Sequence, residues 1–123
     1  MEINDITHEI LDSAYTVHTE LGPGLLESAY QACLVHELKN KGLKVEVEKP
    51  LPLIYKEIKL DYGYRIDILV EDKVVVELKT VDAFNDVHMA QVLTYLKLSG
   101  CKVGLLLNFY TKHLKDGIKR LIL

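Results

Sequence analysis

Two short apolar segments, residues 63–71 and 74–81, constrain this chain more than any other feature. Both are rich in Ile, Val and Leu, which favour β-strands, and only the polar turn between them interrupts the run. Successive residues of a strand point to opposite faces of the sheet. The charged side chains within the two strands recur at that spacing and all fall on one face: Arg65, Asp67, Glu77 and Lys79.

The length of the polar turn fixes how these two strands pair. If residues 71–73 form a three-residue turn, Val70 pairs with Val74 and Asp67 stands opposite Glu77. Side chains of directly opposite residues are about 5 Å apart. A slip of one residue would place the two carboxylates on opposite faces. The proposed site therefore depends on this register.

Two explanations are open for a pair of carboxylates held this close. They repel each other unless a positive charge lies between them. A divalent cation, Mg²⁺ or Mn²⁺, would supply that charge, because both ions prefer oxygen ligands. Alternatively, Arg65 and Lys79 neutralise the carboxylates as ion pairs on an exposed face of the sheet. Strand geometry alone does not choose between them.

Helical and strand patterns surround this hairpin. Apolar residues recur every three or four positions before it, then every two positions, and again every three or four after it. The expected helices are residues 4–21, 26–41 and 85 or 86 to 99, and the further strands are 45–48, 103–109 and 118–123. Pro50 and Pro52 indicate a sheet edge or an irregular segment after the first of these strands.

This order predicts an α/β or α+β fold, with two N-terminal helices and a central mixed sheet flanked by helices. A chain of 123 residues fits one domain, residues 1–123. No apolar run has the length of a membrane span, and the first residues lack a signal-peptide pattern, so we expect a cytoplasmic protein without a membrane partner. Cys33 and Cys101 lack metal-site spacing.

The charge is unevenly distributed. Residues 1–38 contain seven acidic and no Lys or Arg side chains, whereas residues 39–123 contain fifteen basic and eleven acidic ones, within a net charge of −3. That asymmetry permits a local surface that faces phosphate groups, and it equally fits an ordinary solvated face.

Two motifs give the sequence a recognisable relationship. Asp67, followed after nine residues by Glu77-Leu78-Lys79, resembles the Asp…Glu-x-Lys core of the PD-(D/E)XK nucleases. Residues 24–30, Gly-Leu-Leu-Glu-Ser-Ala-Tyr, match the G-x-x-E-x-x-Y signature of a family of small proteins placed in that superfamily. The resemblance covers essentially the whole chain and implies a restriction-endonuclease-like core. Ile66 stands where the proline of the superfamily name would be.

The resemblance also implies roles for individual residues. Asp67 and Glu77 would bind one or two Mg²⁺ or Mn²⁺ ions with the help of the backbone carbonyl of Leu78. Lys79 would orient or deprotonate the attacking water and stabilise charge on the phosphate. Glu27 would add a carboxylate from the second helix. Such a site would perform metal-assisted hydrolysis of phosphodiester bonds.

Several further residues are expected to support the site. Gln91 and Tyr95 form a Gln-x-x-x-Tyr element that, in exonuclease-like relatives, follows the Glu-x-Lys strand and faces the site. Tyr95 has a second interpretation as a core aromatic with a satisfied hydroxyl, and a structural role is the better interpretation of His88. Arg65 is expected to contact a phosphate or to hold the two carboxylates in place.

The G-x-x-E-x-x-Y segment also suggests supporting roles. We interpret Tyr30 as packing that fixes Glu27, because an aromatic at helical spacing is usually part of the core. We interpret Gly24 as a backbone device that allows a close approach of the loop.

The sequence thus predicts a metal-dependent nuclease of an exonuclease-like subgroup that acts on DNA, with RNA as the less favoured substrate. The alternative is a non-catalytic module that binds nucleic acid or protein on the same fold, because a fold does not guarantee an activity. A homo-oligomer or an unidentified protein partner is a third expectation. Specific DNA interfaces bury about 1,000 Å² or more of protein surface, which is a large share of a domain this small.

Overall fold

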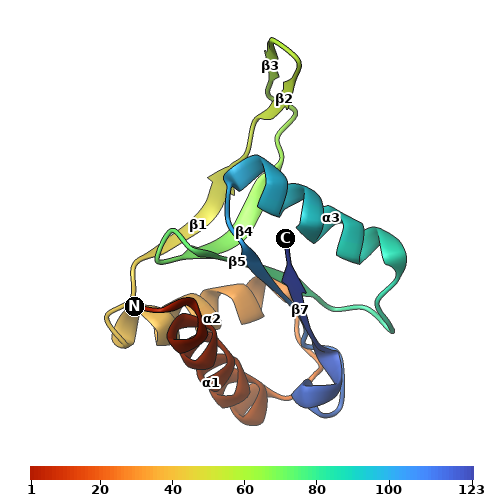
Figure 1. The fold of residues 1–123 in the computed structure, drawn as a ribbon. Coiled ribbons are helices and arrows are strands. Elements are labelled where there is room, and N and C mark those ends of the chain that lie inside the picture. The colour runs from red at the N-terminus through yellow and green to blue at the C-terminus, as the bar shows by residue number, and fades with distance from the viewer.

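A five-stranded mixed sheet forms the centre of the computed structural model, which describes residues 1–123 (Figure 1). The order across the sheet is β1-β4-β5-β6-β7, with β5 and β6 parallel and the other neighbours antiparallel. The strands are β1 (Val45–Pro50), β4 (Arg65–Val70), β5 (Val74–Lys79), β6 (Val103–Asn108) and β7 (Ile118–Ile122). The predicted fold class, helices flanking a mixed sheet, is confirmed.

Two helices, α1 (Ile3–Leu21) and α2 (Glu27–Asn40), cover one face of the sheet (Figure 1). Their apolar stripes enter the larger of two hydrophobic clusters, together with Ile68, Val76 and Leu107 from the strands. The α1 stripe follows the predicted spacing of three and four residues, and its buried apolar members are Ile6, Ile10, Ala14 and Val17.

The helix α3 (Asp86–Ser99) covers the opposite face and connects the parallel strands β5 and β6. The Asn85 side chain accepts a hydrogen bond from the His88 N–H, and the His88 ring accepts one from the Asn85 N–H, so the two form a capping box. Gly100 ends the helix with φ 78°, in the left-handed region. This role confirms that His88 is structural.

The hairpin between β4 and β5 has the predicted register, because Val70 pairs with Val74. Its turn places Glu71 and Asp72 at φ 54° and 56°, which are positive as a type I′ turn requires. Lys44 holds this unusual turn: its N–H donates to Glu71 Oε2 at 2.6 Å, and its Nζ donates to Asp72 Oδ2 at 2.7 Å. The turn therefore sets Asp67 and Glu77 at corresponding positions on the two strands.

One detail of strand alternation differs from the expectation. Ile66 was expected to share a face with Ile68, but it is buried in the second cluster, with Tyr95 and Leu51. The β4–β5 pairing ends at Ile68, so the start of β4 pairs with β1 alone. Regular pairing with β5 therefore does not constrain the start of β4, where Ile66 departs from the alternation of faces.

Between β1 and β4 the chain forms a small separate hairpin, β2 (Leu53–Tyr55) and β3 (Ile58–Leu60), which we call the arm. The arm projects from the body of the protein (Figure 1). Pro50 is the last residue of the edge strand β1, as expected for a residue that cannot donate to a ladder. The sequence patterns predicted an irregular or edge segment here and did not predict these strands.

Gly104 in β6 allows α3 to lie close to the sheet. A Cβ atom added at this position would come within 2.7 Å of Val92 Cγ1 and 3.5 Å of Leu96 Cδ2. Val92 is branched at its own Cβ and has few alternative rotamers. The helix would therefore have to move if residue 104 carried a side chain.

We expect Gly104→Ala to lower the free energy of unfolding by about 1–3 kcal/mol through overpacking against Val92. Urea unfolding would measure the loss, and Gly24→Ala is a matched control because a Cβ at Gly24 meets nothing within 4 Å. In a Val92→Ala background the Gly104→Ala loss should shrink. Strictly additive losses in the double variant would contradict this explanation.

Candidate active site

Two carboxylates lie where the β4–β5 ladder opens, and each accepts a main-chain hydrogen bond from the opposite strand. The N–H of Asp67 donates to Glu77 Oε2 at 2.7 Å, and the N–H of Leu78 donates to Asp67 Oδ2 at 2.9 Å. These bonds extend the strand pairing beyond Ile68 and Val76, the last regular pair. The side chains are consequently fixed to the backbone and to each other.

The carboxylate pair is held in an environment that disfavours negative charge. Glu77 is 3% exposed, and burial, followed by the charge of Asp67, raises its pKa from 4.5 to about 8. Burial is also the main cause that raises the pKa of Asp67. A cation between the two carboxylates would relieve this repulsion and favour their ionised forms.

Direct ion pairing does not neutralise the pair. None of the ion pairs in the structure, at N···O distances up to 4.0 Å, joins Arg65 or Lys79 to Asp67 or Glu77. Arg65 donates to the Tyr64 carbonyl at 3.0 Å and lies 3.9 Å from an oxygen of Asp61. The expectation that Arg65 holds the carboxylates is therefore wrong, and so is the ion-pair explanation.

Lys79 is oriented by α3. The half-buried lysine donates from Nζ to Gln91 Oε1 at 3.4 Å, and Gln91 Nε2 donates to the Tyr95 hydroxyl at 3.1 Å. Tyr95 is 5% exposed, and burial raises its pKa, with added effects from the charges of Glu77 and Asp67. Gln91 and Tyr95 thus connect the helix to Lys79 on β5. Tyr95 is also a core residue with a hydrogen-bonded hydroxyl, which agrees with its interpretation as a core aromatic.

Glu27, the first residue of α2, approaches the pair from the other side of the sheet. Its side chain is half-buried, and burial and the charge of Asp67 raise its pKa while Lys79 opposes that rise. The charges of Asp67 and Lys79 therefore both act on the Glu27 carboxyl group.

Tyr30 fixes the loop that leads to Glu27. Its ring stacks on Phe109 with 4.6 Å between the centroids, and its hydroxyl donates to the Gly22 carbonyl and accepts from the Leu25 N–H. The structure therefore supports the interpretation of Tyr30 as packing. The interpretation of Gly24 is corrected: its φ lies outside the left-handed region and no atom lies near its Cβ position, whereas Gly22 has φ 70°.

The sequence analysis missed Glu48 on β1. Between the pairs Val47↔Ile68 and Lys49↔Ile66, the register places Glu48 opposite Asp67. Its φ of 51° is rare for a residue with a side chain, and its Oε1 accepts from Gln31 Nε2 at 2.8 Å. Its negative charge raises the pKa values of the other three carboxyl groups. The acidic residues that alternate along β1 could have indicated a site residue, but the sequence alone did not show which strand β1 pairs with.

The donor set fits a hard divalent cation. No group of three His, Cys, Asp or Glu side chains is placed to hold a metal ion by itself. Mg²⁺ commonly binds through one or two carboxylates and completes its shell with water and substrate phosphates. Asp67 and Glu77 match that pattern, because they supply two adjacent carboxylates on neighbouring strands.

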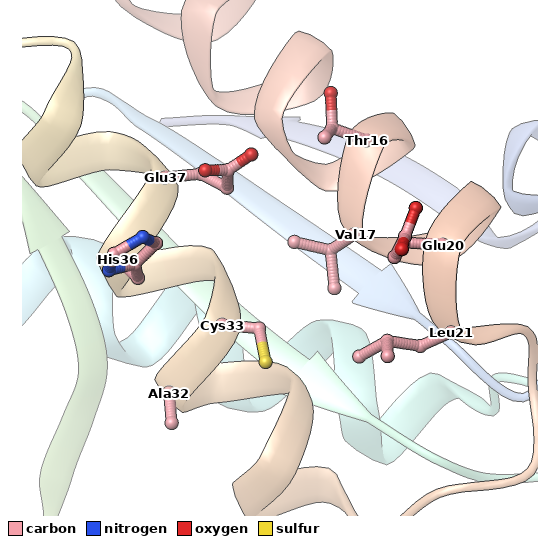
Figure 2. A pocket seen from close by; sticks show the side chains of 8 residues that line it. All are labelled: Thr16, Val17, Glu20, Leu21, Ala32, Cys33, His36 and Glu37. Atoms are coloured by element: carbon pink, nitrogen blue, oxygen red, sulfur yellow. The ribbon is translucent and has the colours of Figure 1, made fainter.

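The wide cavity between α1 and α2 is separate from this site. It has a volume of about 440 Å³, and Figure 2 shows Val17 and Leu21 of α1 facing Cys33 of α2 across it. None of the site carboxylates Glu27, Glu48, Asp67 and Glu77 lines it. None of the three helices has both the length and the apolar character needed to cross a membrane.

Comparison with known protein families agrees with this geometry. The family model described as the PD-(D/E)XK nuclease superfamily matches residues 4–121. No curated protein and no solved structure shows a significant match to the chain. The family match covers both strands of the carboxylate pair and all three helices.

The raised pKa of Glu77 predicts how the stability of the metal-free protein depends on pH. The folded state favours the protonated carboxyl, so this stabilisation is complete below pH 4.5 and is lost as the pH rises to about 8. We expect Glu77→Gln, which cannot ionise, to lose less stability over that interval. Thermal unfolding in a chelator at several pH values would measure the difference. Parallel curves for both proteins would contradict the prediction.

Proposed function

The chain belongs to the PD-(D/E)XK nuclease superfamily, and we propose that it is a metal-dependent nuclease that hydrolyses phosphodiester bonds in DNA. The observation that carries this proposal is the Asp67–Glu77 pair. Both carboxylates are held in place by main-chain N–H groups, and no basic side chain forms a direct ion pair with them. Membership of a nuclease superfamily makes nucleic acid the expected substrate, with RNA as the second choice.

We also propose a narrower relationship within the superfamily. Gly24, Glu27 and Tyr30 form the G-x-x-E-x-x-Y signature, and the hydrogen bond from the Leu25 N–H to the Tyr30 hydroxyl, in the loop that leads to Glu27 at the start of α2, supports a role for this segment. The Gln91–Tyr95 element supports assignment to an exonuclease-like subgroup.

In the proposed mechanism, Asp67, Glu77 and the Leu78 carbonyl would hold Mg²⁺ or Mn²⁺. Such an ion, when bound, would lower the pKa of a coordinated water molecule and neutralise charge on phosphate oxygens. Lys79 places a positive charge beside the phosphate, where negative charge develops as the bond breaks. Gln91 keeps the lysine aimed at that position through its hydrogen bond to Nζ.

Other residues support the reaction from the edges of the site. Glu27 would add a carboxylate for a second ion or for a metal-bound water, since the charge of Asp67 acts on it and raises its pKa. Arg65, which has no partner among the carboxylates of the site, is available to contact a phosphate of the substrate. The small surface of the chain favours self-association or a protein partner for a firm grip on DNA, which sedimentation with and without DNA would reveal.

Removal of site residues should separate binding from catalysis. We expect Asp67→Ala to abolish cleavage in Mg²⁺ or Mn²⁺, and Lys79→Ala to slow it by about 100- to 1,000-fold. Glu77→Ala should remove Mn²⁺ binding measured by calorimetry. Asp116→Asn is a matched control, because this exposed carboxylate lies on the short 3-10 helix Leu114–Gly117 and is not among the groups that shift the pKa of Asp67 or Glu77.

The negative results are equally specific. If no single- or double-stranded substrate is cut with either metal, although Mn²⁺ binds and Glu77→Ala prevents that binding, catalysis is refuted. If Mn²⁺ does not bind at all, the chain is better described as a non-catalytic binding module.

Glu48→Gln tests the carboxylate that the sequence analysis missed. The substitution removes a negative charge opposite Asp67 and keeps the side-chain length, so we expect Mn²⁺ affinity to fall by about 10-fold or more. Glu46→Gln is the control, because Glu46 lies two residues away on the same strand and pairs with Lys49 at 2.7 Å. Equal Mn²⁺ affinities of the two variants would show that Glu48 does not serve the metal.

A further inference from the structure

A small cavity adjoins the candidate active site at the foot of the arm. It has a volume of about 230 Å³ and is lined by Leu53, Tyr64, Gln91, Thr94, Tyr95 and Leu98. Figure 1 shows the arm leaving the body of the protein beside α3. The cavity therefore lies between the arm and the helix that orients the lysine of the site.

One side chain joins this cavity to the catalytic lysine. Gln91 lines the cavity, donates to the Tyr95 hydroxyl at 3.1 Å and accepts from Lys79 Nζ at 3.4 Å. A phosphate that contacts Lys79 would consequently lie one side chain away from the cavity. In a nucleotide, the base is separated from its phosphate by a single sugar, so the two binding positions match the two ends of one nucleotide.

The lining of the cavity suits a flat ring. Leu53 and Leu98 are apolar, and Tyr64 carries a ring that is 45% exposed and thus available for stacking. Bases stack on such aromatic side chains without regard to sequence. The cavity is smaller than the roughly 300–1,000 Å³ of sites that enclose drug-sized ligands, so it fits one ring system.

The polar groups of the cavity suit the edge of a base. The Tyr95 hydroxyl accepts from Gln91 and keeps its own proton available to donate. Thr94 adds a hydroxyl on the exposed side. Hydrogen-bonding groups beside a stacking ring are the means by which proteins hold an unstacked base.

We propose that this cavity binds the base of a nucleotide next to the phosphodiester bond that is cut, in a single-stranded segment of nucleic acid. The inference deepens the proposed function and rests on it for the position of the phosphate. Tyr64 supplies the stacking surface, and Tyr95 and Gln91 contact the edge of the base.

Binding of a fluorescent single-stranded DNA oligonucleotide to the full chain in a chelator, measured by anisotropy, tests the cavity without cleavage. We expect Tyr64→Ala to raise the Kd by about 5- to 100-fold, and Tyr64→Phe, which keeps the ring, to leave it nearly unchanged. Thr94→Trp should also weaken binding, because the larger side chain fills the cavity. Tyr62→Ala is the matched control: this tyrosine is 71% exposed and does not line the cavity.

A second comparison identifies the base as the bound group. This comparison uses a set of oligonucleotides that each lack one base, at a different position in each strand. For one of these strands, the Kd with the wild-type chain should be as high as the Kd of the intact strand with Tyr64→Ala. Tyr64→Ala should lose nothing further with that strand. If the two losses add, Tyr64 contacts something other than the base and the proposal is overturned. Equal binding by Tyr64→Ala and Tyr62→Ala, or no binding of single strands to the wild type, also overturns it.

Metal binding distinguishes failure of the cavity from failure of the nuclease. Tyr64→Ala should keep the Mn²⁺ affinity of the wild type, whereas Asp67→Ala should lose it. If the wild type cuts DNA while Tyr64→Ala binds and cuts equally well, the cavity is refuted and the nuclease stands. If nothing is cut but the binding losses caused by the missing base and by Tyr64→Ala still do not add, the cavity stands and the nuclease is refuted.

Discussion

The site depends on a strand pair that opens before it ends. Beyond Ile68 and Val76, the hydrogen bonds between β4 and β5 pass from the main chain to the side chains of Asp67 and Glu77. Each carboxylate is thereby fixed by the strand that carries the other one. The arrangement keeps two carboxyl groups adjacent where burial opposes their ionisation, and a cation between them would favour the ionised forms.

The remaining elements maintain this opening from several directions. Lys44 holds the turn that sets the register, and Tyr30 holds the loop from which Glu27 emerges. On the opposite face, α3 lies close enough for Gln91 to reach Lys79 only because residue 104 has no side chain. The two helical layers therefore converge on the strand pair from both faces, and each contributes a polar group to it.

The local sequence pattern was sufficient to predict the β4–β5 hairpin and insufficient to predict the residues that surround it. The register of Asp67 and Glu77 followed from the length of a turn, which neighbouring residues decide. Glu48 could not be recognised because its position depends on how β1 pairs with β4, a contact between distant parts of the chain. The predicted contact of Arg65 with the two carboxylates was wrong because the alternation of side chains between faces assumes that the β4–β5 ladder continues. This ladder stops at Ile68. Gly24 was expected to have a special backbone conformation, but Gly22 is the glycine of this loop with a positive φ.

The two ends of the arm are joined to each other at its base. The chain leaves the sheet at Pro50 and returns at Arg65, which are partners in the ladder, and the Leu51 N–H donates to the Tyr64 carbonyl at 2.9 Å. The ends of the arm are thus joined whatever residues lie between them. Doubling the length of such a loop adds only about 0.6 kcal/mol to the free energy of closing it. Insertions or deletions at the tip of the arm can accordingly change how far this protein reaches toward a substrate. Asp67, two residues after Arg65 at the base of the arm, stays in register.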